Sequence, residues 1–113
     1  MKLPYRNNVI IPDKKLTDYL LSVIHPEGQS KARLLRSWGF NKSNNHELKG
    51  AFRKIVRTRK VVSSRPSDDR SGINYVIDGK IIIPIGGVRK IRTIWYIKHG
   101  SRKPRFITAI PLK

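Results

Sequence analysis

The spacing of apolar residues changes near residue 60, and this change constrains the fold more than any other feature of the sequence. Before it, apolar side chains recur every three or four residues, as in helices. After it they alternate, most clearly in residues 91–98 (IRTIWYIK). Helices followed by strands with short connections predict an α+β fold. We expect N-terminal helices packed on one face of a four- to five-stranded antiparallel sheet.

Three helices are expected in the first half. The first begins at Pro12, which suits a first helical turn, and ends before Pro26, because proline disfavours a helical residue ahead of it. The second covers residues 29–38. The third begins at Asn44, because Glu47 three residues later completes a pattern that resembles a capping box.

The second half predicts strands separated by turn residues. The expected strands are residues 73–77, 80–85, 91–98 and 106–110, with a short one beginning at Val61. Asp78-Gly79 is a strong hairpin signal, so a turn is expected there, and Gly86-Gly87 is a second break. The 113 residues predict one domain, with a helical half at about 12–60 and a β half at about 61–111.

Positive charge dominates the composition. Lys and Arg number 25 against 7 Asp and Glu, which gives a net charge of +18. From Gly79 to the end there are nine basic residues and no acidic one. Such a charge favours a polyanionic partner, and nucleic acid bound through its phosphates is the simplest one. We expect the sheet face away from the helices to carry these cations.

Several function classes are excluded by what the sequence lacks. Without cysteine there is no disulfide, thiolate zinc site or thiol nucleophile, and no apolar run approaches the roughly 20 residues of a membrane span. Metal-dependent nuclease chemistry needs clustered carboxylates, and Asp68-Asp69 is the one adjacent pair. No metal or other cofactor is expected.

RNA can also be cleaved without a metal. The 2′-hydroxyl attacks its own phosphate when a base takes its proton, an acid protonates the leaving oxygen, and cations stabilise the phosphorane. The expected catalytic residues are His25, Lys31, Arg92 and Thr108. His25 precedes a helix N-terminus, which favours a phosphate, although a capping or packing histidine would also fit. Thr108 could equally be a buried hydroxyl.

A further set of residues is expected to bind the RNA itself. It comprises Arg33, Arg89, Lys90, Trp95, Lys98, His99, Arg102, Lys103 and Arg105. Most of these are cations that would contact the backbone phosphates. Trp95 would stack on a base if it were exposed, and would otherwise belong to the core.

Several motifs together resemble a known family. They are residues 25–33 (HPEGQSKAR) with Gly39-Phe40, residues 75–79 (YVIDG), residues 93–95 (TIW) and residues 104–111 (PRFITAIP). The family consists of small prokaryotic domains of undefined function, found as stand-alone chains beside a partner gene and as C-terminal tips of large exported proteins. The resemblance covers about residues 3–112 and places His25, Lys31, Trp95, Arg105 and Thr108 at shared positions. This chain differs in its extra basic residues and in Leu34-Leu35, where the family often has aromatics.

The resemblance implies a toxin of the toxin–antitoxin or contact-dependent inhibition type. The order of elements is also similar to the barnase, colicin and RelE-like ribonucleases, which is an analogy of fold. These likenesses imply a metal-independent ribonuclease that cleaves tRNA, leaves a 2′,3′-cyclic phosphate and is held in check by an acidic immunity protein or antitoxin. Its site of action would be the cytoplasm of a target cell. The alternatives are a non-catalytic nucleic-acid-binding module and a protein-interaction domain.

Overall fold

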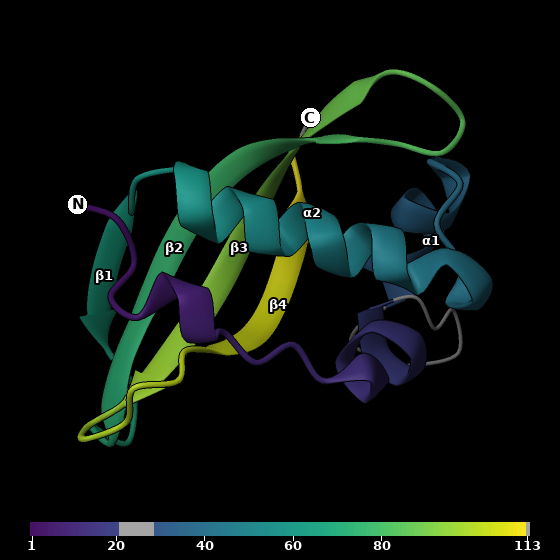
Figure 1. Ribbon diagram of the computed structural model, residues 1–113. Coiled ribbons are helices and arrows are strands. Elements are labelled where there is room, and N and C mark those ends of the chain that lie inside the picture. Colours follow the sequence, from purple (N-terminus) through teal and green to yellow (C-terminus); the bar gives the residue numbers. More distant parts are fainter. Residues whose placement is uncertain (21–28, 113) are drawn as a thin grey trace.

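The computed structural model describes residues 1–20 and 29–112, with the side chains of residues 18–20 and 29–31 outside the description (Figure 1). Its helical elements are η1 (Arg6–Asn8), η2 (Lys15–Leu20), α1 (Gln29–Ser37), η3 (Lys42–Asn44) and α2 (Asn45–Thr58). Its strands are β1 (Ser63–Pro66), β2 (Gly72–Ile82), β3 (Val88–Lys98) and β4 (Arg105–Pro111).

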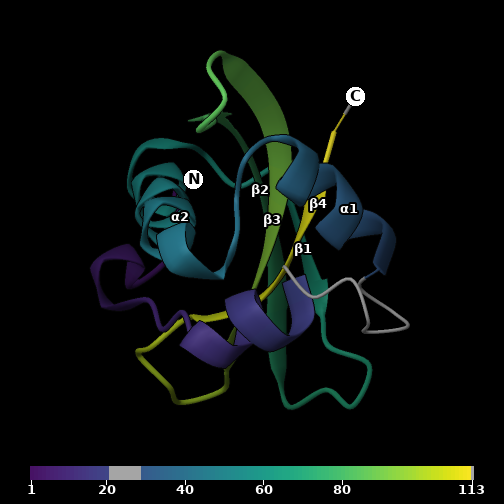
Figure 2. The same ribbon diagram turned by 90° about the vertical axis from the view of Figure 1, so that its right-hand side faces the viewer.

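The four strands form one antiparallel sheet in the order β1-β2-β3-β4. The helix α2 lies across one face of this sheet, which we call the inner face (Figure 1). The shorter elements α1 and η2 lie beside β4 at the edge of the sheet and contact that strand (Figure 2). The predicted α+β class and the antiparallel sheet are therefore confirmed, with α2 as the main helix packed on it.

The core lies between α2 and the inner face. The apolar stripe of α2 buries Leu48, Phe52 and Ile55. Phe52 stacks on Phe106 of β4 with ring centroids 5.0 Å apart, and Trp95 of β3 meets Phe106 edge-on at 5.4 Å. The alternation of β2 and β3 predicts this packing, because every second side chain of a strand points to the same face.

The prediction of a turn at Asp78-Gly79 is wrong. β2 runs through both residues, and the chain turns instead near Gly86 and Gly87, whose φ angles are 97° and 101°. Close packing of α2 explains the glycine within the strand. A Cβ at Gly79 would lie 2.7 Å from Cγ1 of Ile55, so only glycine lets α2 approach β2 this closely.

Gly79→Ala is expected to lower the free energy of unfolding by about 1–3 kcal/mol, because the added methyl must displace Ile55 in a packed core. Urea unfolding measures the change. Gly50→Ala is the matched control, since nothing lies within 4 Å of a Cβ at this exposed helical position. The control should stabilise by about 0.5–1 kcal/mol, because alanine is the better helix former. Equal effects of the two variants would contradict the packing explanation.

The start of the third helix also differs from the prediction. The capping box forms between Asn41 and Asn44 around η3, and α2 follows directly. The Asn44 side chain accepts from the Asn41 backbone N–H at 2.8 Å and donates to the Gly39 carbonyl at 2.9 Å. Asn44 therefore does not cap α2 with Glu47, since its side chain is already engaged with the preceding turn.

Candidate nucleic-acid interface

The sheet face opposite α2, which we call the outer face, carries cationic side chains from all four strands. Strand register and alternation place on it Arg65, Lys80, Lys90, Arg92, Lys98 and Arg105. Asp78 is the one acidic residue in the four strands. This face therefore presents a positive surface on a rigid platform, which suits a phosphate backbone.

Arg92 lies near the middle of the outer face in a bidentate ion pair with Asp78. Its Nε donates to Oδ1 at 2.8 Å and its Nη2 donates to Oδ2 at 2.9 Å. These hydrogen bonds and the carboxylate charge raise the pKa of the Arg92 guanidinium above its usual value. Because a guanidinium has five N–H donors, about three remain for a ligand. Asp78 thus orients the Arg92 guanidinium and leaves some of its N–H donors available to a ligand.

Thr108 shares the outer face with Arg92. Thr108 pairs with Ile94 across the β3–β4 ladder, and Arg92 pairs with Ile110. The two predicted residues are therefore diagonal neighbours on adjacent strands, within reach of one phosphate. Thr108 is half-buried and already takes part in a polar interaction.

A hollow of about 450 Å³ lies on the β1 side of the outer face. Its apolar lining comes from Val76, Ile94 and Ile107, and its polar lining from Ser63, Ser64, Arg65 and Asn74. An apolar lining with amide and hydroxyl groups beside it fits a planar base, and the guanidinium of Arg65 in the same lining can bind a phosphate. Residue-by-residue reading of the sequence missed this hollow because its lining comes from four strands.

Tyr96 marks a second cationic hollow, of about 250 Å³, toward the other end of the outer face. It is lined by Ile10, Tyr96, Lys98, Ser101, Lys103 and Arg105. The Tyr96 hydroxyl and Ser71 Oγ are 2.5 Å apart, and Ser71 Oγ donates to Asp69 at 2.7 Å. Because the serine has one proton to give, Tyr96 is the donor to Ser71.

The hydroxyl and backbone N–H of Ser71, together with the Ser67 hydroxyl, lower the pKa of Asp69 to about 2. The carboxylate is therefore charged near neutral pH and holds the loop beneath Tyr96. The prediction of site residues missed Tyr96, although alternation in residues 91–98 already placed it on the same face as Arg92.

The remaining predicted residues lie in several places. His25 falls outside the described residues, and of Lys31 only the backbone, in α1, is described. Arg33 is exposed on α1. Exposed basic side chains also come from the start of β3 and from the loop that follows β3, namely Arg89, His99, Arg102 and Lys103. The described structure therefore brings together Arg92 and Thr108, and separately Lys98, Lys103 and Arg105.

Trp95 corrects one predicted RNA contact. Its side chain points to the inner face and is 0% exposed. Its indole N–H donates to Thr93 Oγ1 at 2.8 Å, and the threonine hydroxyl donates to the Ile77 carbonyl at 2.8 Å. A residue enclosed in this way cannot stack on a base, so Trp95 belongs to the core.

The described part of the chain holds neither a metal-binding cluster nor a membrane-spanning helix. Among residues 1–20 and 29–112, no three His, Cys, Asp or Glu side chains are grouped so as to hold a metal ion. In the same part of the chain, no helix combines the length and the apolar character needed to cross a membrane.

Comparisons with known proteins agree with this architecture. A chain of the contact-dependent growth inhibition toxin–immunity protein complex from Klebsiella pneumoniae 342 superposes with a TM-score of 0.69 at 20% sequence identity. The match covers 96% of this chain and 97% of that chain, so the two share a fold over nearly their full lengths. No curated protein matches the sequence significantly. The profile of a family described as a domain of unknown function, DUF6883, matches residues 2–113, and the chain therefore belongs to that family.

Proposed function

We propose that this domain is a metal-independent endoribonuclease toxin that cleaves tRNA. The observation that carries the proposal is the outer face, where six strand cations share one surface with a hollow suited to a base and the one strand carboxylate is held by Arg92. A second support is the fold, which is shared with a chain of a growth inhibition toxin–immunity protein complex.

In the proposed reaction the 2′-hydroxyl attacks the adjacent phosphorus, the 5′-oxygen leaves, and a 2′,3′-cyclic phosphate remains. His25 serves as general base or general acid, because imidazole exchanges protons near neutral pH. Lys31 and Arg92 stabilise the charge on the phosphorane, and Thr108 orients the phosphate. The outer-face geometry supports the roles of Arg92 and Thr108, since these two residues are diagonal neighbours there.

Asp78 gives Arg92 a further advantage in this role. A guanidinium already held by two hydrogen bonds loses little conformational freedom when it meets a phosphate. Positioning of this kind places the remaining N–H donors where charge develops during the reaction.

The proposed partner is an acidic immunity protein or antitoxin. The net charge of +18 favours an acidic surface, and the chain with the similar fold comes from a complex with an immunity protein. The toxin would act in the cytoplasm of a target cell after delivery as the C-terminal part of a larger exported protein. Expression of the domain should then arrest growth unless the partner is also present.

A non-catalytic nucleic-acid-binding module is the second candidate function. The same outer-face cations favour it, because phosphate binding requires positive charge and does not require a histidine. An assay for RNA cleavage distinguishes the ribonuclease from the binding module.

Binding of tRNA is expected to depend on where positive charge lies. Lys98→Gln with Arg105→Gln removes two outer-face cations. This change should reduce the slope of log affinity against log salt concentration by about 0.7 for each lost phosphate contact. Filter binding between low and physiological salt measures the slope.

Arg53→Gln with Arg57→Gln is the matched control, because it removes the same charge from exposed positions on α2. The control should leave the slope nearly unchanged. Equal losses in the two double variants would show that net charge alone drives binding, and would remove the outer face as the interface.

A further inference from the structure

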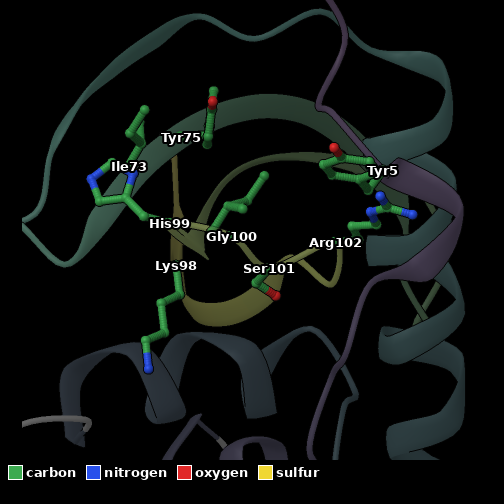
Figure 3. Close-up of a pocket in the computed structure, with 9 residues that line it drawn as sticks. Tyr5, Ile73, Tyr75, Lys98, His99, Gly100, Ser101 and Arg102 are labelled. Carbon is green, nitrogen blue, oxygen red and sulfur yellow. The ribbon is translucent and has the colours of Figure 1, made fainter.

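A third hollow, of about 400 Å³, lies on the inner side of the sheet, where β3 passes into the loop before β4 (Figure 3). We call it the His99 cleft. Its lining includes Tyr5, Tyr75, His99, Ser101 and Arg102, with Ile73 and Ile97 as apolar walls. The volume falls within the range of about 300–1,000 Å³ that is usual for small-molecule sites.

The hydroxyl of Tyr75 points to a missing ligand. Tyr75 is only 9% exposed, yet its hydroxyl forms no hydrogen bond with any residue in the described part of the chain. Buried polar groups without a partner are rare in folded proteins, and each calls for an explanation. Figure 3 shows the Tyr75 side chain at the upper edge of the cleft lining, with His99 on one side and Tyr5 on the other.

The polar groups of the cleft favour an anion. Arg102 contributes a positive charge and His99 an imidazole to its lining, and none of the lining residues is acidic. Ser101 Oγ accepts from the Lys103 backbone N–H at 3.1 Å, which leaves the serine proton for a ligand. A guanidinium with nearby hydroxyl donors matches the oxygen atoms of a phosphate. Lys98 also lines the hollow, but its side chain points away from Tyr75 and Tyr5 (Figure 3).

The aromatic group at the rim favours a planar partner for that anion. Tyr5 is 49% exposed and has a left-handed backbone with φ of 55°. A non-glycine residue in this conformation is uncommon, and such residues cluster at ligand sites. Its exposed ring and the apolar walls from Ile73 and Ile97 can enclose a nucleobase.

We propose that the His99 cleft binds a nucleoside monophosphate. Its phosphate accepts hydrogen bonds from Arg102 and from the Tyr75 hydroxyl, and its base lies against Tyr5. The cleft is lined by inner-face residues of β2 and β3, and it adjoins the Tyr96 hollow through Lys98 and Ser101, which line both. The nucleotide site is proposed in addition to the outer-face RNA surface and does not depend on cleavage. The nucleotide can be free or can be the 5′-phosphorylated end of an RNA.

The Hε1 proton of His99 gives a local probe, because the chain has only three histidines. AMP is expected to shift this ¹H NMR signal saturably, whereas adenosine or inorganic phosphate alone should shift it much less. The signal is assigned by its loss in His99→Asn. An unmoved His99 signal at millimolar AMP, or equal shifts with inorganic phosphate, would overturn the proposal.

Tyr75→Phe tests the unpaired hydroxyl. It should weaken AMP binding about tenfold, the effect of one hydrogen bond to a charged group, while the melting temperature stays near that of the parent protein because no internal hydrogen bond is lost. Arg102→Gln should weaken AMP at least as much, and Arg53→Gln, which removes an exposed charge from α2, should not. Unchanged AMP affinity in Tyr75→Phe would overturn the site.

The source of the nucleotide is decided by comparing two ligands at the same His99 signal. One is free AMP and the other is a short RNA with a 5′-monophosphate, measured beside the same RNA without it. Tighter binding of the phosphorylated RNA than of AMP assigns an RNA end to the cleft. Tighter binding of AMP assigns a free nucleotide. Either result supports the nucleotide site, and binding of neither would contradict it.

Discussion

Replacing His25 with alanine is expected to lower the rate of tRNA cleavage by about 100-fold or more. A general acid or base contributes a factor of this size, because without it the 2′-hydroxyl or the leaving oxygen must exchange its proton with water. Binding of tRNA should change little, since the outer-face cations that hold the phosphates are intact. Single-turnover cleavage and filter binding measure the two quantities separately.

His46→Ala is the matched control for that variant. His46 is exposed in the first turn of α2, on an element that covers the inner face and not the outer face, so its loss should leave cleavage unchanged. Equal cleavage by the parent and by His25→Ala would place the proton transfer on another residue. A described candidate for that role would then be Tyr96, whose hydroxyl donates to Ser71 on the outer face.

Trp95→Ala is expected to lower the free energy of unfolding by about 3–5 kcal/mol, as large aromatic-to-alanine changes in cores do. The indole is fully buried, meets Phe106 edge-on and donates to Thr93. Its removal leaves a cavity and takes away the hydrogen-bond donor that engages Thr93. Guanidinium unfolding followed by circular dichroism measures the change.

Trp95→Phe is the companion variant. It keeps most of the apolar volume and loses the N–H donor, so it should cost less than Trp95→Ala. A near-neutral Trp95→Ala that lost RNA affinity would contradict the buried position and return Trp95 to the RNA surface.

The sequence predicts the fold class well because burial enforces local periodicity. The alternation in β3 and the apolar stripe of α2 both survive into the structure, since each buries one face against the other. The incorrect prediction of a turn at Asp78-Gly79 shows what local sequence patterns cannot predict. Glycine there serves the approach of Ile55, a residue more than twenty positions away, and no local pattern reports such a contact.

The candidate site is less predictable from sequence for the same reason. Residue type alone selected Arg92 and Thr108, but their shared face depends on the β3–β4 register and its bulge near Trp95. The ion pair of Arg92 with Asp78 also depends on register, because the two residues are fourteen positions apart. An indole can stack on a base or pack in a core, so residue type alone does not place Trp95. Its position on the side of β3 that faces α2 puts it in the core.

Cleavage of purified tRNA in EDTA, with analysis of the new 3′ ends, tests the central claim most directly. The account predicts discrete fragments that end in 2′,3′-cyclic phosphate and persist when all divalent metal is chelated. Intact tRNA that only shifts in a gel, with and without added cell extract, would contradict the ribonuclease and leave a nucleic-acid-binding module.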